Sequence, residues 1–583
     1  GGSARSRGAN RSQPCGMSRA RAVTRHASSD FVGRHYEVIR EIGRGSFSRV
    51  QLVRERRTGH ERVCKVVDTR EMAEEVLQLT RAEIKVLSDL DHPSVVKLYE
   101  YSDDPAKHRL VLILEYIAGG DCSGLLAETE EQLSEGRVAR LVQQLLVAVN
   151  CCHSRDIVHR DIKPQNMMLT RNIGAWGCPD LKMIDFGLAA CMKTSRDFVG
   201  TPAYMPPEVL SDHVDYTSQV DMWSIGCTVM ELLTGEAPFG KPEDFGGDMD
   251  PVFEAIRDYT SFDDISAAME ELPGWTERSD EARDFVQRLL RADPSRRMTA
   301  MQALNHPWIA RHTPPQTGLT ADLVRSMADY SSMPLFLRCC LFIIMARSGG
   351  AEQGRVGAAF ADADADGSGL VSLEELVDAF QGASVCGWGA SRVDASTVLA
   401  GCDLGGTGRL SFTDFAAACS FARLGRNIER LADLSFAALD SDREDQVWMS
   451  GVRALFPGQT LEAMADLPQD KPFGAQQWRA CLRSVAASSA VCDKSAGCRF
   501  PGTWAEADED EPRNPLMRFL KGLMCEQLLC NGCEQYRDDE DTTLGDAPVV
   551  LCHNYDPNLE VPIPEYKVPD IPARMANTGG TLD

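Results

Sequence analysis

Two short stretches of charged and amide residues constrain this chain more than any other feature. The chain reads HRDIKPQN from residue 159 and DFG from residue 185. Phosphoryl transfer asks a protein mainly to position phosphates and to neutralise charge. Asp161 can accept the proton of an attacking hydroxyl, and Lys163 can contact the transferred phosphoryl group. Asn166 and Asp185 can bind magnesium, so the two stretches predict a phosphoryl-transfer site.

The segment before these stretches contains the other groups that phosphate chemistry needs. The sequence GRGSFSRV lies between two predicted strands and places Gly43 and Gly45 where backbone N–H groups can approach nucleotide phosphates. Lys65 lies on the next predicted strand and can hold the α- and β-phosphates. Glu83, in a predicted helix, has the spacing to pair with the Lys65 ammonium group.

The hydrophobic pattern predicts an α+β fold for this part of the chain. From residue 36, short β-branched runs alternate with turns, and a helical stretch at 71–90 precedes the buried strand RLVLILEY. Beyond residue 135 the pattern is mostly that of amphipathic helices. We therefore expect a small strand-rich lobe followed by a larger helical lobe, with the phosphate chemistry between them.

These motifs resemble the eukaryotic protein kinase family over residues 36–308, where MPPE, DMWSIG and Arg297 in DPSRRMT complete the set. The resemblance implies a bilobal kinase fold, ATP and Mg²⁺ as cofactors, and protein substrates. Lys163 and Thr201 resemble the signature of Ser/Thr kinases, which implies transfer to protein Ser or Thr hydroxyls. The nucleotide contacts implied by the resemblance are Ile42, Gly43, Gly45, Val50, Lys65, Glu83, Glu115 and Asp121.

Several residues depart from the family pattern. Ser48 replaces the third glycine of the phosphate loop, Val63 replaces the Ala above the adenine ring, and Pro206 replaces the Ala of the APE motif. None of these changes removes a charge that the chemistry requires. An active enzyme is therefore the favoured interpretation, and a pseudokinase scaffold is the alternative.

The activation loop carries an acidic residue at a regulatory position. Asp197 lies where many kinases have an activating phospho-Thr, and Arg160 precedes the proposed catalytic aspartate. A pair between Asp197 and Arg160 could order the loop without phosphorylation, because the carboxylate supplies the charge that a phosphate would bring. A solvated Asp197 is the alternative.

A second module begins with the sequence DADGSGLVSLEE at residue 364, which fits the spacing of an EF-hand calcium loop. Gly369 supplies the sharp turn of such a loop. An acidic surface loop is the alternative. The predicted calcium ligands are Asp364, Asp366, Ser368, the backbone carbonyl of Leu370, and Glu375.

Later loops in this module match the EF-hand pattern less well. DLGGTGRLSFTD, from residue 403, has Gly405 in place of a carboxylate and ends in Asp414, whose short side chain favours weak calcium binding or magnesium. DSDREDQVWMSG, from residue 440, has Asp445 at the glycine position and Gly451 at the glutamate position. This loop and the segment around Asp466 are predicted to be structural hands.

The segment ADLVRSMADYSSMPLFLRCCLFIIMA at 321–346 joins the two modules. It is predicted to form a helix that changes from amphipathic to apolar along its length, and such a helix is unfavourable when exposed to water. A kinase domain, such a junction and four EF-hands together resemble the calcium-dependent protein kinases. Two hosts could bury the junction, the kinase cleft and a calcium-opened EF-hand groove. Competition between them predicts an autoinhibited kinase that calcium releases. An EF-hand domain that stays docked and does not respond to calcium is the alternative.

The composition excludes other classes of function. The net charge of −25 argues against a nucleic-acid binder, which needs clustered Lys and Arg. Twenty scattered cysteines indicate reduced thiols in a cytoplasmic protein. The most apolar run, 335–346, is shorter than the roughly 20 residues of a membrane span. We expect a monomer without a transmembrane segment, and a peripheral contact of the basic tail with membranes stays open.

These patterns divide the chain into five expected parts. They are a flexible basic tail at 1–35, a kinase domain at 36–308, a linker with an autoinhibitory junction helix at 309–350, an EF-hand domain at 351–485, and an acidic, mostly irregular tail at 486–583.

Overall fold

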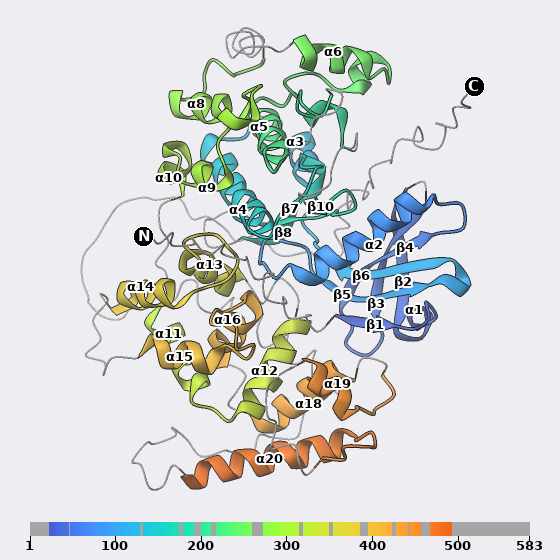
Figure 1. Cartoon of the computed structure of the whole chain (residues 1–583), viewed down its shortest axis with the longest axis vertical. Coiled ribbons are helices and arrows are strands. Elements are labelled where there is room, and N and C mark those ends of the chain that lie inside the picture. The colour runs from blue at the N-terminus through green and yellow to red at the C-terminus, as the bar shows by residue number, and fades with distance from the viewer. Residues whose placement is uncertain are drawn as a thin grey trace, which may run out of the picture.

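The computed structural model describes residues 23–45, 47–128, 132–173, 179–191, 200–210, 217–258, 272–313, 319–348, 354–384, 394–421, 427–440, 443–455 and 467–492. Within these residues the chain forms a small lobe built on one sheet, a larger helical lobe, and a third, all-helical module (Figure 1). The predicted α+β bilobal fold with a helical module after it is therefore confirmed.

The small lobe is a six-stranded sheet with one long helix packed on it. The strand order is β1-β5-β6-β4-β3-β2, and β4 runs antiparallel to both of its neighbours. Lys65 on β4 lies beside Val50 on β3 and Leu112 on β6, which holds the lysine in the centre of the sheet. The elements are β1 (Thr24–His26), α1 (Phe31–His35), β2 (Tyr36–Arg44), β3 (Ser48–Glu55), β4 (Glu61–Asp68), α2 (Glu74–Asp89), β5 (Leu98–Asp104) and β6 (Arg109–Glu115).

The first two of these elements correct the prediction of a flexible tail through residue 35. Strand β1 pairs in parallel with the edge strand β5, and this pairing uses backbone groups, so it leaves no hydrophobic pattern in the sequence. The fully buried Phe31 anchors the following turn and stacks on His26 with ring centroids 3.9 Å apart. One buried aromatic ring in a polar segment is a weak sequence signal, which is why composition missed it.

The larger lobe surrounds the buried helix α4. Ala139, Leu141 and Leu145 of α4 are fully buried in the same hydrophobic core as Trp223 and Ile225 of α5. The hairpin β8–β9 returns the chain to the interlobe cleft. The elements are α3 (Cys122–Glu128), α4 (Glu135–His153), β7 (Ile157–Val158), β8 (Met167–Ile173), β9 (Pro179–Met183), β10 (Ala190–Cys191), α5 (Gln219–Thr234), α6 (Asp250–Asp258), α8 (Asp280–Leu289), α9 (Ala300–Leu304) and α10 (Pro307–His312).

The helical module has a core separate from that of the kinase-like lobes. Short antiparallel bridges join its loops in pairs, Val371 with Leu410 and Val447 with Phe473, as in paired EF-hands. Helix α20 runs to Cys492, beyond the boundary expected at 485. The helices are α11 (Ala321–Ser331), α12 (Leu335–Arg347), α13 (Gly354–Ala363), α14 (Leu373–Ser384), α15 (Ala395–Cys402), α16 (Phe412–Cys419), α18 (Ile428–Leu439), α19 (Met449–Leu455) and α20 (Ala475–Cys492).

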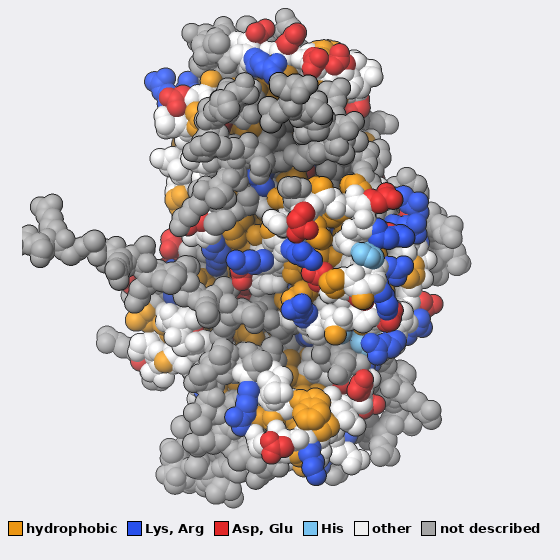
Figure 2. All heavy atoms as spheres, turned by 45° about the vertical axis from the view of Figure 1, so that its right-hand side comes forward, with side chains coloured by type: hydrophobic (Ala, Val, Ile, Leu, Met, Phe, Trp, Pro, Cys, Tyr) orange, Lys and Arg blue, Asp and Glu red, His pale blue; other side chains and the backbone are white. Residues whose placement is uncertain are grey.

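The surface of the small lobe is rich in basic side chains despite the acidic composition of the chain. Figure 2 turns this lobe toward the viewer and shows Lys and Arg side chains together with fewer acidic ones.

Within the part of the chain that the structure describes, none of the helices has both the length and the apolar character of a membrane span.

A buried ion pair holds the larger lobe together below the cleft, and we predict that it is a major source of stability. The Arg297 guanidinium donates to both carboxylate oxygens of Glu208, at 2.6 and 2.7 Å, and its side chain is fully buried. Arg297→Ala leaves a buried carboxylate unpaired, so the free energy of unfolding should fall by about 3 kcal/mol in urea titrations. Arg296→Ala, at an exposed neighbour, is the matched control. Equal stability of the two variants would contradict this assignment.

Candidate active site

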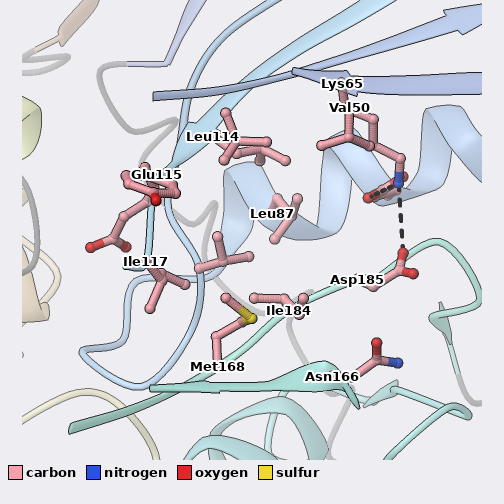
Figure 3. Close-up of a pocket in the computed structure, with 14 residues that line it drawn as sticks. Val50, Lys65, Leu87, Leu114, Glu115, Ile117, Asn166, Met168, Ile184 and Asp185 are labelled. Carbon is pink, nitrogen blue, oxygen red and sulfur yellow. Dashed lines mark hydrogen bonds and ion pairs between the residues drawn. The ribbon is translucent and has the colours of Figure 1, made fainter. Parts of the chain in front are cut away.

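A cleft between the two lobes has an apolar roof and floor (Figure 3). Val50, Val63 and Leu114 line it from the small lobe, while Met168 and Ile184 line it from the larger lobe. The free space is about 690 Å³, part of it open to solvent. Small-molecule sites are typically mostly apolar with a few polar groups, so a flat aromatic ligand suits the lining of this cleft.

Three charged residues meet at the inner end of the cleft. The Lys65 ammonium lies 2.9 and 3.0 Å from the two carboxylate oxygens of Glu83, which comes from helix α2, as the sequence spacing predicted. The same ammonium is 3.6 Å from Asp185 Oδ1 (Figure 3). Burial opposes the ionisation of Asp185, but the ammonium groups of Lys65 and Lys163 hold its pKa below the usual value. Asp185 is therefore an anion at neutral pH, as a metal-binding carboxylate must be.

A second group of polar side chains fixes the orientation of Asp161. Thr201 Oγ1 donates to Asp161 Oδ1 at 2.7 Å, and the Asn166 amide donates to Asp161 Oδ2 at 3.0 Å. The Lys163 ammonium lies 2.9 Å from Asp161 Oδ2 and donates to Thr201 Oγ1 at 2.6 Å. Asp161 thus has a fixed rotamer at the mouth of the cleft, with an ammonium group beside it.

The backbone around Asp161 is held by a carboxylate in helix α5. Asp221 is fully buried and accepts hydrogen bonds from the backbone N–H of His159 at 2.9 Å and of Arg160 at 2.8 Å. Arg160 has a φ of +69° and Asp185 one of +59°, conformations that residues other than glycine avoid. The site therefore keeps a strained backbone, which buried hydrogen bonds stabilise.

Asp221 is the part of this arrangement that sequence reasoning missed. The motif DMWSIG marks the resemblance to kinases but by itself gives Asp221 no role. An Asp inside an otherwise apolar helix, with 15 of the 16 residues of α5 buried, was the available signal, because a buried carboxylate needs several donors. Thr201 was known from its motif, but the hydrogen bond that it donates to Asp161 was not expected.

Some of the predicted nucleotide contacts line the cleft, and others lie beside it. Val50, Lys65, Glu83 and Glu115 line the cleft. The Glu115 carboxylate pairs with the Lys182 ammonium at 3.0 Å. Ile42 is buried beside Val50, and Gly43 and Gly45 lie on β2 and the turn after it.

Two predicted residues require separate comment. Asp121 is not among the residues that line the cleft, and its carboxylate instead accepts the N–H of Gly124 at 2.8 Å at the start of α3. A turn carboxylate after a glycine pair has the same sequence signature as a ligand contact. Asp197 lies outside the described residues, so the pair with Arg160 stays a prediction.

The first EF-hand loop brings its predicted ligands together. Carboxylate oxygens of Asp364, Asp366 and Glu375 lie within 4.8 Å of one another. Asp364 accepts the N–H of Gly369, the turn glycine with a φ of +74°, at 2.8 Å. Burial, together with the neighbouring carboxylates, raises the pKa of Asp364 to about 7. A divalent cation would relieve this repulsion, so the loop has the charge pattern of a cation site.

The other two predicted ligands of this loop lie beside the three carboxylates. Ser368 Oγ donates to the Leu370 carbonyl oxygen at 3.1 Å and lies 3.4 Å from Asp364 Oδ1. The structure therefore gathers all five predicted groups in one loop. In the second hand, Asp414 Oδ2 accepts from Ser411 Oγ at 2.6 Å, the same local bond that Glu375 Oε2 accepts from Ser372 Oγ at 2.8 Å in the first hand. The weaker affinity of the second hand stays a prediction.

The junction helices lie inside the helical module rather than in the cleft. Tyr330 of α11 and Phe336, Leu341 and Ile343 of α12 belong to the core formed with the EF-hand helices. Ser326 Oγ in α11 also donates to the Ala418 carbonyl oxygen of α16 at 2.9 Å. The module thus buries the apolar junction and leaves the described part of the cleft free of it.

Comparison with known proteins gives matches over both parts of the chain. A family model described as a protein kinase domain matches residues 36–309. Calcium-dependent protein kinase 17 of Arabidopsis thaliana is 30% identical over 422 residues, which cover 71% of this chain and 75% of that protein. Calcium-dependent protein kinase 34 of the same plant is 30% identical over 390 residues, covering 66% and 70%. Myosin light chain kinase A of Dictyostelium discoideum is 34% identical over 300 residues, covering 51% and 93%.

We predict that Asp221 stabilises the strained loop through its charge. Asp221→Asn replaces one of the two acceptor oxygens with an NH2 group, so either the N–H of His159 or that of Arg160 loses its acceptor. The free energy of unfolding at neutral pH should fall by about 3 kcal/mol in urea titrations. Asp280→Asn, at a residue whose side chain is 91% exposed, is the control.

The difference in unfolding free energy between wild type and Asp221→Asn should also depend on pH in a defined direction. Although burial opposes ionisation, hydrogen bonding to His153 and the backbone holds the pKa of Asp221 below its ordinary value of 3.8. The contribution of Asp221 is therefore present above that value and is lost as the pH falls through the folded-state pKa. The difference between wild type and Asp221→Asn should shrink on acidification. A difference that grows at low pH would contradict this account.

Proposed function

Because this chain belongs to the calcium-dependent protein kinase family, we propose that it transfers the γ-phosphate of ATP to protein Ser and Thr hydroxyls under the control of calcium at its first EF-hand. The observation that carries the proposal is the arrangement of one cleft. It holds the Lys65–Glu83 pair against its inner wall and Asp161, fixed by three side chains, at its mouth.

The residues of the cleft divide the chemistry between them. Lys65, held by Glu83, would bind the α- and β-phosphates of the nucleotide. Asp185 and Asn166 would hold magnesium, which supplies charge neutralisation and an in-line orientation of the phosphates when bound. Both residues line the same cleft. The apolar side chains above and below would receive the adenine ring.

Asp161 would accept the proton of the substrate hydroxyl. Its carboxylate is oriented by Thr201, and Lys163 places a positive charge where the transferred phosphoryl group becomes more negative. The hydrogen bond between Thr201 and Asp161 supports a Ser/Thr substrate, because GTPAY together with Lys163 resembles the signature of Ser/Thr kinases. The substrate class itself is part of the proposal.

The first hand is the proposed calcium sensor. Its three carboxylates converge, and its loop contacts helix α4 of the larger lobe. Asn150 of helix α4 donates to the carbonyl oxygens of Asp366 and Gly367, both at 2.9 Å. Any change in the loop conformation on calcium binding would therefore act on α4. Calcium would favour the arrangement in which the module holds the junction helices, and the cleft would be open to substrate.

A second candidate function is an active kinase whose EF-hand domain does not respond to calcium. This candidate is favoured by the sequence of the later loops, where Gly405 and Gly451 stand at ligand positions. It shares the catalytic proposal and differs only in the effect of calcium on rate.

The catalytic role predicts a loss of turnover rather than of binding. Asp161→Asn should lower kcat for a Ser-containing peptide by about 10³-fold, because the amide cannot take the proton of the hydroxyl. The KM for ATP should change little, since Asp161 lies at the mouth of the cleft and is absent from its lining. Steady-state kinetics with labelled ATP measures both. A variant with wild-type kcat would refute the role.

The sensor role predicts a loss of calcium affinity at one loop. Glu375→Gln removes a carboxylate that can bind calcium through both oxygens. Titration calorimetry should show a larger loss than the roughly tenfold to hundredfold that removal of an outer-shell partner costs. Glu374→Gln, at the exposed preceding residue, should bind calcium like the wild type. If both variants bind equally, the loop is not the sensor.

A further inference from the structure

The third EF-hand, formed by α18, the loop from residue 440 and α19, lies against the small lobe (Figure 1). Its neighbour there is the turn at 56–60 that joins β3 and β4. The loop departs from the calcium pattern at its sixth and twelfth positions, which are Asp445 and Gly451. The contacts of this loop are made by arginines.

Arg57 of the β3–β4 turn reaches the first position of the loop. Its guanidinium lies 2.7 Å from Asp440 Oδ2, and the Asp440 side chain is fully buried. The same guanidinium donates to the backbone carbonyl of Asp440 at 3.2 Å and to that of Ala437. These groups are the carboxylate that would bind calcium in a working hand and two carbonyls at the end of helix α18, of which the Asp440 carbonyl also accepts the N–H of Arg443 at 3.3 Å. One cation from the kinase lobe satisfies both.

The loop keeps an EF-hand-like turn without glycine. Asp445 has a φ of +57° and Arg443 one of +58°, the left-handed region that favours glycine. Asp440 Oδ1 also accepts the N–H of Glu444 at 3.1 Å. The N–H groups of Arg443 and Glu444 thus point toward Asp440, although the twelfth position of the loop offers no carboxylate.

Arg443 makes the reciprocal contact from the loop to the small lobe. Its guanidinium donates to Glu55 Oε1 at 2.5 Å and lies over the Tyr36 ring at 5.0 Å from the centroid. Although burial opposes ionisation, Arg443 and the Thr58 hydroxyl hold the pKa of Glu55 at about 2. Glu55 and Arg57 flank the start of one turn, so the hand and the hairpin exchange two arginine–carboxylate pairs.

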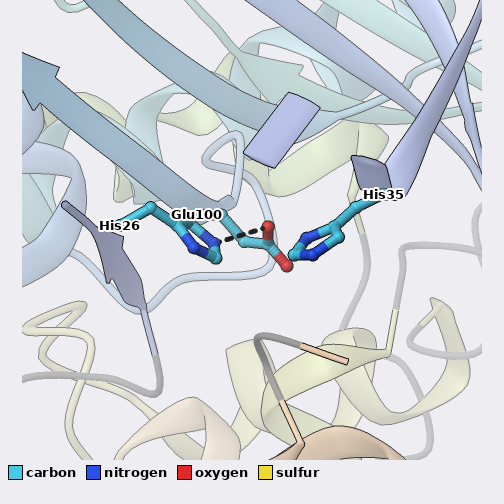
Figure 4. Close-up of side chains that lie close together, drawn as sticks. All are labelled: His26, His35 and Glu100. Carbon is cyan, nitrogen blue, oxygen red and sulfur yellow. Dashed lines mark hydrogen bonds and ion pairs between the residues drawn. The ribbon is translucent and has the colours of Figure 1, made fainter. Parts of the chain in front are cut away.

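The carboxylate of Glu100, beneath this contact, lies between two histidines (Figure 4). His26 Nε2 is 3.0 Å from Glu100 Oε2, and His35 completes a group whose ligand atoms lie close enough to share a metal ion. Arg443 and Arg347 lie 3.6 and 3.9 Å from Glu100 Oε1. Two guanidinium groups beside the one carboxylate would repel a divalent ion, so here too arginine supplies the positive charge.

From these contacts we propose that the third hand is a calcium-independent dock for the β3–β4 hairpin of the kinase domain, in which the Arg57 guanidinium takes the place of the calcium ion at Asp440. The partner it fits is a basic hairpin with an acidic residue two positions before the arginine. The hand would stay on the small lobe whether calcium is present or absent. This inference does not depend on the proposed calcium response of the first hand.

The two hands would then have different tasks. The first hand meets α4 through backbone carbonyls of a loop that calcium can rearrange. The third hand meets the hairpin through side-chain ion pairs that involve no metal. Calcium would alter one end of the module while the other end stays anchored. Such an anchor keeps the module next to the kinase domain between calcium signals.

Hydrogen–deuterium exchange of the full chain tests the dock directly. Peptides covering 428–439 and 443–455 should be equally protected in excess chelator and in excess calcium. Arg57→Gln should speed their exchange on the order of tenfold to a hundredfold in both conditions, because a buried carboxylate and the end of α18 lose their donor. Arg56→Gln, at the exposed neighbour on the same turn, should exchange like the wild type.

A double-mutant comparison separates direct pairing from general loosening. If Arg57 acts through Asp440, then Asp440→Asn combined with Arg57→Gln should exchange no faster than the more affected single variant. Additive effects would overturn the assignment of the guanidinium to Asp440. Protection of α18 that appears only with calcium, or equal exchange in Arg57→Gln and Arg56→Gln, would overturn the dock. The chelator comparison on wild-type protein decides the matter even if a variant fails to fold.

Discussion

The need to bury helix α12 organises the regulatory half of this protein. Ten of its 13 residues are buried, and they cover the whole circumference of the helix rather than one face. Burial of a large apolar side chain is worth about 1.5–3 kcal/mol, so exposure of this helix to water would cost far more than one ion pair supplies. The helix must therefore always have a host. In this structure the host is the EF-hand module, and Phe336 packs against Trp478 of α20 with ring centroids 4.9 Å apart.

The same helix connects the module to the kinase domain. Its last turn ends at the small lobe, where the Lys97 ammonium donates to the Met345 carbonyl oxygen at 3.1 Å and Arg347 donates to the Tyr99 carbonyl oxygen at 3.2 Å. Farther along the interface, Thr413 of α16 donates to the Asp91 carboxylate through its N–H at 3.0 Å. These contacts are polar, so they can rearrange at small cost in free energy, whereas the arginine–carboxylate pairs of the third hand keep the module on the small lobe.

Short-range patterns predicted the parts of the site that depend on spacing within one motif. The order of Asp161, Lys163 and Asn166 predicted one cluster, and the structure places these side chains within hydrogen-bonding distance. The spacing of the first EF-hand loop likewise predicted which carboxylates would converge, because such a loop folds on itself. Prediction of the pair between Lys65 and Glu83 also required that the predicted helix pack against the strand that carries Lys65.

Contacts between distant segments could not be predicted in the same way. Arg57 and Asp440 are 383 residues apart. Arg57 reads in the sequence as an ordinary surface charge, and Asp440 reads only as the first position of a degenerate EF-hand loop. Strand β1 forms because an edge of the sheet is available, and that edge exists only after the sheet has folded. At Asp121 the structure adds a local role to the predicted one, since its carboxylate accepts the N–H of Gly124 at the start of α3, and the nucleotide contact stays a prediction.

The central claim is that the host of α12 decides whether the cleft is open, and that calcium decides the host. Its most direct test is the rate of phosphate transfer from labelled ATP to a serine peptide by the full chain, with magnesium constant and calcium raised stepwise from excess chelator. The account predicts a low rate in chelator that climbs to a plateau as calcium fills the first hand. Equal rates at every calcium level would contradict it.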